Sequence, residues 1–321
     1  MTDSTIAFFE GKFVPLTEAK ISVQMHAFNY GTAIFEGIRG YYNRDEDEIY
    51  LFRLAEHYRR MLNNCKLIKI ELPYSAQDLC DLTAEMLRLN NFHRDIYVRP
   101  LAYKTACQIG TKLSPGSDYT MFAVAMDDYI ATDHPLSVCI SSWRRLEDNS
   151  IPPRGKICGS YVNSALAATE ARDNGFDEAI VLNNDGHVAE GAAMNIFMVR
   201  EGKLVTTPIT ANILEGITRT ALVRIAKEEL GVETEARQID RSELYMADEL
   251  FFCGTGAQIA SIGAVDHRQI GDGHTGPITR ALQHIYDRVV RGYHEGYAEW
   301  RTPVYKTAPL ISQSAKQNVM V

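Results

Sequence analysis

Short apolar segments that pair across tight turns occur in both halves of the chain, and they constrain its fold more than any other feature. Apolar residues 6–9 and 13–14 flank Glu10-Gly11-Lys12, which is typical of a β-hairpin. Residues 179–182 lead into Asn183-Asn184-Asp185-Gly186, whose residue types tolerate the positive φ of a hairpin turn. Because hairpins join antiparallel strands, an α+β fold is favoured over a doubly wound parallel sheet.

Helical periodicity occurs between these strands. Apolar residues recur every three or four positions in residues 54–66 and 75–90, which predicts two helices. Gly175 and Gly231 follow two further helical patterns, as expected for residues that end a helix in the left-handed conformation. The other predicted helices cover residues 164–174, 218–230 and 278–293, and further strands are predicted at 96–103, 119–126, 136–142, 195–199, 204–207 and 249–253.

A polar stretch at residues 127–135 separates two groups of elements. It has few apolar anchors and ends in Pro135, which is typical of a linker. We predict a small N-terminal α+β domain over residues 1–126, a large C-terminal α+β domain over 136–303 and an irregular polar tail over 304–321. A pocket between two domains is the expected place for a ligand.

Composition limits the kinds of partner. The 321 residues include 33 Lys plus Arg and 41 Asp plus Glu, a net charge of −8, and 45% of them are hydrophobic. Such a chain has ample material for a globular core, and its acidic balance argues against a nucleic-acid surface. Its apolar runs are too short to span a membrane, and its N-terminus has no export signal, so we expect a cytoplasmic protein without a membrane partner.

The cysteines and histidines do not have the spacing of metal ligands. The six cysteines form no C-x-x-C pair, and the nine histidines include no H-x-x-x-H pair. We therefore expect no metal and mostly packed, reduced thiols. A G-x-S-x-G sequence is also absent, so the chain lacks that signature of a hydrolase nucleophile.

Two glycine-containing turns have features of an anion site. Gly216-Ile217-Thr218-Arg219 opens into a predicted helix, whose first turn carries a partial positive charge. On local sequence alone, a simple N-cap role for Thr218 is the more common explanation. Gly254-Thr255-Gly256 follows a predicted strand and allows backbone amides and a hydroxyl to approach a ligand. The dinucleotide and nucleoside triphosphate fingerprints are absent.

Lys156 and Glu190 are candidate functional groups. Lys156 lies among small and apolar neighbours before a predicted helix, where an amine can act as a nucleophile toward an aldehyde. Glu190 ends a predicted strand and precedes the small residues Gly191-Ala192-Ala193, so a ligand can approach it closely. Taken singly, each is more commonly an ordinary loop residue.

Together and in this order, the motifs of the chain resemble those of the class IV (fold type IV) pyridoxal-phosphate aminotransferases, and within them the branched-chain amino acid aminotransferases. The resemblance extends over residues 6–293 and implies a two-domain α+β fold, like that of D-amino acid aminotransferase, with the active site between the domains. It implies pyridoxal 5'-phosphate (PLP) as the cofactor. The segments that carry it are residues 26–39, 56–60, 97–100, 156–161, 190–191, 216–219 and 254–255.

The resemblance implies a role for each residue of the cofactor site. Lys156 would bind PLP as a Schiff base and then carry a proton between substrate and cofactor. Glu190 would contact the pyridine nitrogen, and Tyr161 would contact the ring oxygen. The phosphate would be bound by Arg60, the amides of Ile217 and Thr218, and Gly254 with the hydroxyl of Thr255.

For the substrate, the resemblance implies a carboxylate near Tyr97 and Arg99, with help from the backbone of Thr255 and Gly256. An apolar pocket selects Leu, Ile and Val by burying methylenes, at ~1–3 kcal/mol per group, so other side chains would be tolerated. The implied partners are small amino acids and 2-oxo acids, in a homodimer or a larger homo-oligomer such as a hexamer. The implied pocket residues are Phe35, Gly37, Arg39 and Tyr161, and Tyr30 and Leu113, which would come from a neighbouring subunit.

These roles imply ping-pong transfer of the amino group from L-Leu, L-Ile or L-Val to 2-oxoglutarate, giving branched 2-oxo acids and L-glutamate. Tyr97-x-Arg99 favours this reaction over that of a D-amino acid or (R)-amine transaminase. An aminodeoxychorismate lyase-like enzyme and a non-catalytic protein of this fold are further alternatives. Met194 in place of an acidic residue, Asp127-Asp128 in the linker and the loop at 104–117 depart from the family pattern and bear on specificity.

Overall fold

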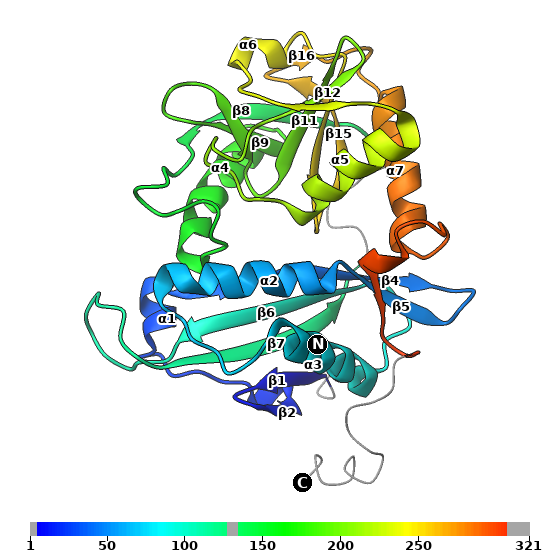
Figure 1. Cartoon of the computed structure of the whole chain (residues 1–321). Coiled ribbons are helices and arrows are strands. Elements are labelled where there is room, and N and C mark those ends of the chain that lie inside the picture. The colour runs from blue at the N-terminus through cyan, green and yellow to red at the C-terminus, as the bar shows by residue number, and fades with distance from the viewer. Residues whose placement is uncertain (1–4, 127–133, 307–321) are drawn as a thin grey trace. The chain divides into compact units, whose positions relative to one another are not determined.

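The structure is a computed structural model that describes residues 5–126 and 134–306 (Figure 1). The chain divides into two compact units, each discontinuous in sequence. Unit 1 contains residues 1–127, 156–159 and 288–321, and unit 2 contains residues 128–155 and 160–287. Most of the predicted linker, with Asp127-Asp128, and most of the predicted tail lie outside the described residues.

Unit 1 is built on an antiparallel sheet. Its strand order is β17-β5-β4-β6-β7-β1-β2, and β3 also pairs with β6. The first predicted hairpin is confirmed, because Ile6 pairs with Pro15 and Phe9 with Lys12. The strands are β1 (Ile6–Phe9), β2 (Lys12–Pro15), β3 (Ala33–Phe35), β4 (Ile38–Asn43), β5 (Glu48–Phe52), β6 (Ile96–Lys104), β7 (Ser117–Ala125) and β17 (Arg301–Pro303).

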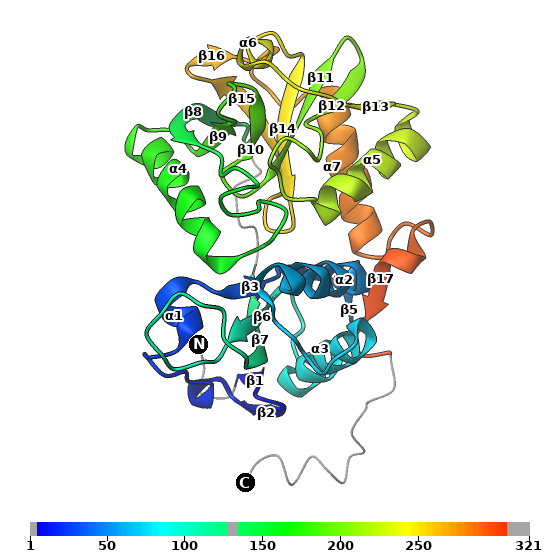
Figure 2. The ribbon, with the colours of Figure 1, turned by 60° about the vertical axis from the view of Figure 1, so that its left-hand side comes forward.

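In the part of unit 1 that the structure describes, the sheet is accompanied by the α-helices α1 (His26–Tyr30), α2 (Leu54–Cys65) and α3 (Ala76–Asn90). Helix α3 begins with a capping box in which Asp78 N–H donates to Ser75 Oγ and Ser75 N–H donates to the Asp78 carboxylate. Figures 1 and 2 show α2 and α3 on one face of the sheet. The predicted apolar face of α2 is buried there, including Leu54, Tyr58 and Met61.

Unit 2 is built on a mixed sheet in the order β10-β9-β8-β15-β14-β11-β12-β13, with β16 paired to β15. The pairs β8–β9, β8–β15 and β12–β13 are parallel, and the other pairs are antiparallel. The strands are β8 (Leu136–Arg144), β9 (Glu178–Leu182), β10 (Val188–Gly191), β11 (Asn195–Arg200), β12 (Lys203–Thr206), β13 (Thr234–Ala236), β14 (Glu249–Gly254), β15 (Gln258–Val265) and β16 (Arg268–Gln269).

The helices of unit 2 agree with the predicted periods but differ at their ends. Helix α4 (Tyr161–Asp173) begins three residues before the predicted start, because the apolar pattern is weak in its first turn. Helix α5 (Ile217–Leu230) ends at Gly231, whose φ of 64° is the predicted left-handed conformation. The short helix α6 (Arg241–Leu244) was not predicted, and α7 (Pro277–Val290) ends three residues early.

The core of unit 2 lies against its sheet. Its buried apolar cluster draws side chains from seven strands, among them Val138, Ile180, Ile196, Phe252 and Ile262. Strands β14 and β11 both contribute consecutive buried residues, which is typical of strands covered on both faces. This packing fixes the strand ends from which the candidate functional side chains project.

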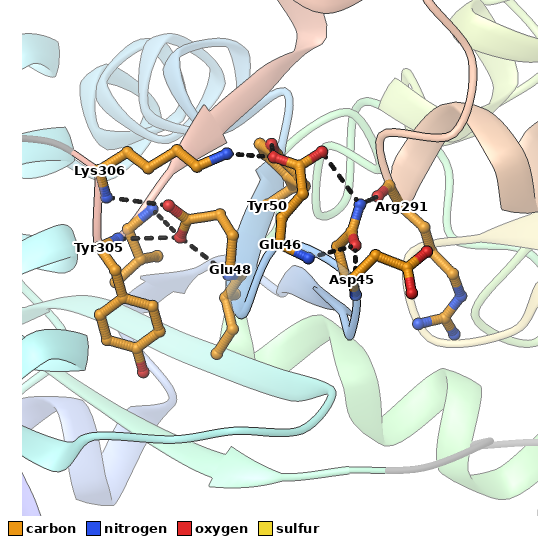
Figure 3. A network of polar contacts seen from close by, with 10 residues as sticks. Asp45, Glu46, Glu48, Tyr50, Arg291, Tyr305 and Lys306 are labelled. Carbon is orange, nitrogen blue, oxygen red and sulfur yellow. Dashed lines mark hydrogen bonds and ion pairs between the residues drawn. The ribbon is translucent and has the colours of Figure 1, made fainter.

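A buried carboxylate holds residues 304–306, the start of the predicted tail. Glu48 Oε1 accepts the N–H groups of Ile49, Val304 and Tyr305 at 2.8–2.9 Å, and Oε2 accepts that of Lys306 at 2.9 Å (Figure 3). Four backbone donors thus compensate for removing this charge from water. The contact joins the end of the described chain to β5 beside β17.

Most of the thiols are packed, as predicted. Burial raises the pKa of Cys65 and Cys80 to about 12 and that of Cys139 to about 11. Cys253 is also buried, whereas Cys107 is exposed, which the prediction of mostly packed thiols allows. Within the described residues, no helix is long and apolar enough to cross a membrane.

Candidate active site

The predicted site residues occur in both units, and their geometry is described within each unit. Unit 1 contains Tyr30, Phe35, Gly37, Arg39, Arg60, Tyr97, Arg99, Leu113 and Lys156. Unit 2 contains Tyr161, Glu190, Ile217, Thr218, Gly254, Thr255 and Gly256.

Lys156 belongs to unit 1 because its backbone pairs with β3. Its carbonyl accepts the N–H of Phe35 at 3.0 Å, and Ile157 forms an antiparallel bridge with Ile34. The Lys156 Nζ lies 4.4 Å from the centroid of the Phe35 ring, within the range of a cation–π contact. The pairing of Lys156 and Ile157 with β3 therefore fixes the backbone position from which the Lys156 side chain extends.

Two glycines allow this segment to approach β3. Gly159 N–H donates to Gly31 O at 3.0 Å, and a Cβ on Gly31 would lie 2.6 Å from Gly159 Cα. Gly31 also has a φ of 66°, which favours glycine. The motif around residues 26–39 thus contains a backbone contact with the segment that carries Lys156.

Tyr97 and Arg99 lie together on β6, as the Y-x-R spacing predicts for residues on one side of a strand. Arg99 Nη2 donates to the Tyr97 hydroxyl at 2.9 Å, and its guanidinium lies 4.6 Å from the Phe35 ring centroid. A Cβ on Gly37 would lie 2.0 Å from the Tyr97 hydroxyl, so a larger residue at this position would displace the Tyr97 side chain. Unit 1 therefore brings four predicted residues together: Phe35, Gly37, Tyr97 and Arg99.

Arg60 is oriented by a fully buried carboxylate that the sequence analysis did not single out. Its Nε and Nη2 each donate to one oxygen of Glu36 at 2.7 Å, in a bidentate pair. His57 Nδ1 lies 2.8 Å from Glu36 Oε2. His57 and Arg60, both on α2, thus point toward Glu36 at the end of β3. The pair with Glu36 fixes the orientation of the Arg60 guanidinium.

Burial and charge act in opposite directions on this cluster. Burial alone would raise the pKa of Glu36, but the Arg60 guanidinium and the His57 hydrogen bond hold it well below its usual range. Burial lowers the pKa of His57, although the hydrogen bond to Glu36 opposes that shift. The cluster is therefore an ionised carboxylate and guanidinium beside a neutral imidazole.

Tyr30, Leu113 and Arg39 are placed elsewhere in unit 1. Tyr30 ends α1, and its hydroxyl accepts the N–H of Gly110, in the loop that also contains the half-buried Leu113. Arg39 is fully buried, and its Nη2 lies 3.6 Å from the Asp95 carboxylate. The predicted substrate roles of these three residues stay predictions.

In unit 2, Glu190 lies at the end of β10 in a network of polar contacts. Its Oε1 lies 2.6 Å from Arg145 Nη2, and its Oε2 accepts the Asn195 amide N–H at 2.8 Å. The Leu214 N–H lies 3.4 Å from both carboxylate oxygens. Arg145 and Asn195 received no role in the sequence analysis: Arg145 stands in none of its motifs, and Asn195 follows Met194 in the pattern after Glu190 but was assigned no contact.

The predicted phosphate seat is the N-terminus of α5. Gly216, rather than Thr218, is the N-cap, so the N-cap explanation for Thr218 is wrong. A Cβ on Gly216 would lie 1.9 Å from Asn195 Oδ1, so a larger residue where the chain enters the helix would displace the Asn195 side chain. Thr218 is buried in the first turn, where the helix carries its partial positive charge.

The other predicted residues of unit 2 stand at the ends of elements. Tyr161 is the first residue of α4, and Gly254 is the last residue of β14, followed by the half-buried Thr255 and Gly256. In the ladder, Asn195 on β11 pairs with Cys253, so the β14 end lies beside the Glu190 network.

The residues present fit PLP by their chemistry. Unit 1 provides an amine at Lys156 and an oriented guanidinium at Arg60, while unit 2 provides a buried carboxylate at Glu190 and a helix N-terminus. These groups match an aldehyde, a phosphate and a ring nitrogen. The described residues contain no group of three or more side chains suited to hold a metal ion.

Comparison with known proteins identifies the family. The model of amino-transferase class IV matches residues 33–265. A probable branched-chain-amino-acid aminotransferase of Aquifex aeolicus is 48% identical over 93% of this chain and 96% of its own length. The branched-chain aminotransferase of Thermoproteus uzoniensis, solved with norvaline, is 40% identical with a TM-score of 0.90, covering 94% of this chain and 100% of that one.

A third structure was solved with a cofactor derivative. The branched-chain amino acid aminotransferase of T.th., complexed with N-(5'-phosphopyridoxyl)-L-glutamate, is 38% identical with a TM-score of 0.89. The match covers 95% of this chain and 100% of that one. These likenesses confirm the predicted two-domain, fold type IV architecture. The chain belongs to the class IV aminotransferase family.

Proposed function

We propose that this chain is a PLP-dependent branched-chain amino acid aminotransferase. It transfers the amino group of L-Leu, L-Ile or L-Val to 2-oxoglutarate by a ping-pong mechanism, giving branched 2-oxo acids and L-glutamate. The observation that carries the proposal is 48% identity to a relative named for this activity over 93% of the chain. The phosphopyridoxyl-glutamate complex of the T.th. enzyme supports both the cofactor and glutamate as a reaction partner.

The residues have distinct tasks in this proposal. Lys156 anchors the cofactor through Nζ and later moves a proton at the substrate Cα. Arg60, Thr255, Gly254 and the first turn of α5 at Ile217 and Thr218 bind the phosphate. Bound PLP supplies an electron sink for the Cα electron pair. Glu190 accepts a hydrogen bond from the ring nitrogen, and Tyr161 donates one to the ring oxygen.

The substrate carboxylate is bound near Tyr97 and Arg99. Arg99 brings a cation, and its stacking on Phe35 and its hydrogen bond to Tyr97 restrict its orientation. Gly37 leaves room for the Tyr97 hydroxyl. This preorganised group, assisted by the backbone of Thr255 and Gly256, favours the L-amino acid reaction.

The protein is also proposed to be cytoplasmic and to work as a homodimer or a larger homo-oligomer such as a hexamer. Large apolar side chains are exposed beside Tyr30, with Val23 at 75%, Phe28 at 66% and Ile109 at 85%. Asn29 donates to Val23 O, and Gly110 donates to Tyr30, so these segments form one surface of unit 1. A second copy of the chain would cover this surface and receive Tyr30 and Leu113.

Two experiments test the function. Both enantiomers of a panel of amino donors, assayed with 2-oxoglutarate and with pyruvate, should give L-Leu, L-Ile and L-Val as the best donors. Preference for D-amino acids or (R)-amines, or pyruvate release without an acceptor acid, would contradict the proposal. Borohydride reduction followed by peptide mapping should find the cofactor on Lys156, and labelling of another lysine would refute the assigned site.

A further inference from the structure

Arg145 forms a close charged contact with Glu190, yet no family motif in the sequence includes it. Glu190 is 2% exposed, so its carboxylate has lost most of its contact with water. Arg145 Nη2 lies 2.6 Å from Glu190 Oε1, whereas Asn195 and Leu214 provide only neutral N–H donors. A buried carboxylate with a cation at this distance strongly favours its ionised form.

The Arg145 guanidinium is itself held in place. Its Nε donates to Asn212 O at 3.0 Å, and its backbone N–H donates to Leu182 O at 2.9 Å. Asn212 in turn donates to Asn183 Oδ1 at 3.1 Å. The guanidinium side chain is 11% exposed, so a swing into solvent would break both the ion pair and the Asn212 contact.

Two other titratable groups act on Glu190 from neighbouring elements. Arg219 on α5 attracts it electrostatically, but its Nε and Nη2 donate to Thr206 Oγ1 and Thr207 O rather than to the carboxylate. Cys253 on β14 also lies within electrostatic range, and burial raises the pKa of its thiol, so the thiol is neutral. Arg145 therefore supplies a direct cationic contact that Arg219 does not.

We propose that Arg145 is a positioning residue for the proton that lies between the Glu190 carboxylate and the ring nitrogen of the cofactor. Arg145 keeps this proton on the ring nitrogen. The inference rests on the proposed contact between Glu190 and that nitrogen. A proton shared by the two groups is repelled by the guanidinium more strongly at the carboxylate, which touches Arg145, than at the more distant ring. Arg145 thus makes Glu190 an acceptor, and the protonated ring becomes the stronger electron sink.

The test uses the holoenzyme loaded with PLP that carries 15N in its ring. The 15N chemical shift at pH 7 reports whether the ring nitrogen is protonated. In Arg145→Gln, the signal should move toward the unprotonated value, and kcat should fall about tenfold or more, since a neighbouring arginine shifts a carboxyl pKa by about 1–3 units. Arg145→Lys retains the charge and should keep the signal near that of the native protein.

Two further variants separate the possible failures. Arg144→Gln changes the exposed residue that precedes Arg145 and ends β8, and it should leave the signal unmoved. Glu190→Gln should move the signal strongly.

An unmoved signal in Glu190→Gln would refute the proposed Glu190 contact itself. A response to Glu190→Gln without one to Arg145→Gln would overturn the inference alone, and so would equal shifts in Arg145→Lys and Arg145→Gln. If circular dichroism shows that Arg145→Gln is unfolded, the test rests on Arg145→Lys, and a shifted 15N signal in that variant would overturn the inference about Arg145.

Discussion

At the scale of single residues, unit 1 uses a buried carboxylate to orient a cation. Glu36 is fully buried and binds both Arg60 and His57, so it is not available to a ligand. A cation that is already fixed loses little conformational entropy when it binds a phosphate. We infer that Glu36 contributes to cofactor affinity through Arg60 without contacting the cofactor.

Glu36→Gln tests this role. The substitution keeps the size of the side chain but leaves the Arg60 guanidinium without its counter-charge, and breaking a buried pair costs about 3–5 kcal/mol. We expect a loss of unfolding free energy near the lower end of that range, because Arg60 is 14% exposed. PLP affinity, measured by equilibrium dialysis, should also fall. The exposed Glu71→Gln is the matched control, and equal affinity in both variants would contradict the role.

The protonation of His57 should make the free energy of unfolding depend on pH. Burial lowers its folded pKa below the ordinary value of 6.5, so the unfolded chain takes up a proton that the folded chain does not. This contribution to stability is complete above pH 6.5 and is lost as the pH falls toward the folded pKa. Urea unfolding at pH 7 and pH 5 should show a smaller loss of stability in His57→Gln than in the native protein, and equal losses would refute this.

At the scale of elements, the ends of strands and helices carry the candidate functional groups. Glu190 is the second-last residue of β10, Tyr161 begins α4, and α5 begins beside Asn195. A side chain also stabilises the end of β17, a three-residue strand that is too short to be stable alone. Its continuation is fixed by hydrogen bonds to Glu48, as Figure 3 shows.

Glu48→Gln should loosen this C-terminal strand. The amide can accept through only one oxygen and carries no charge, so at least one of the N–H groups of residues 304–306 loses its acceptor. Hydrogen exchange of residues 301–306 should become about tenfold faster or more, which corresponds to at least 1.4 kcal/mol. Glu46→Gln, whose carboxylate contacts the Lys306 side chain but not the backbone, should have a much smaller effect.

At the scale of the whole molecule, the chain enters each unit more than once. The segment with Lys156 belongs to unit 1, although the sequence on both sides of it belongs to unit 2. Oligomerisation is the other property at this scale. The exposed apolar surface of unit 1 that includes Val23, Phe28 and Ile109 is proposed to be covered by a second copy of the chain.

Phe28→Glu tests this interface. A charge on a surface that is buried between two copies is not compensated, so the oligomer should dissociate. Light scattering after size-exclusion chromatography should show a smaller mass, and activity should fall because Tyr30 and Leu113 would no longer reach a neighbouring subunit. Ile209→Glu, an exposed apolar site on unit 2, is the control. An unchanged mass for Phe28→Glu would exclude this surface as the interface.

Local patterns in the sequence were sufficient to predict several helices and hairpins and the chemistry of the site. Period-3.6 and turn patterns predicted α2, α3 and the hairpins, because the apolar face of a helix and the residues of a tight turn are local requirements. The ordered motifs predicted the family and the residue types that handle an aldehyde and a phosphate. Strands β3, β4 and β5 were not predicted, because these buried strands, close to Gly37 and Gly40, show no alternation of apolar and polar residues.

Which side chains act on one another depends instead on how the chain folds. Glu36 contacts Arg60 across 24 positions of the chain, and Arg145 contacts Glu190 from the segment that follows β8, so no local pattern could reveal either pair. The approach of Gly31 to Gly159 likewise depends on how distant segments meet. Charges and close contacts act through space, whereas periodicity records only what neighbours along the chain require.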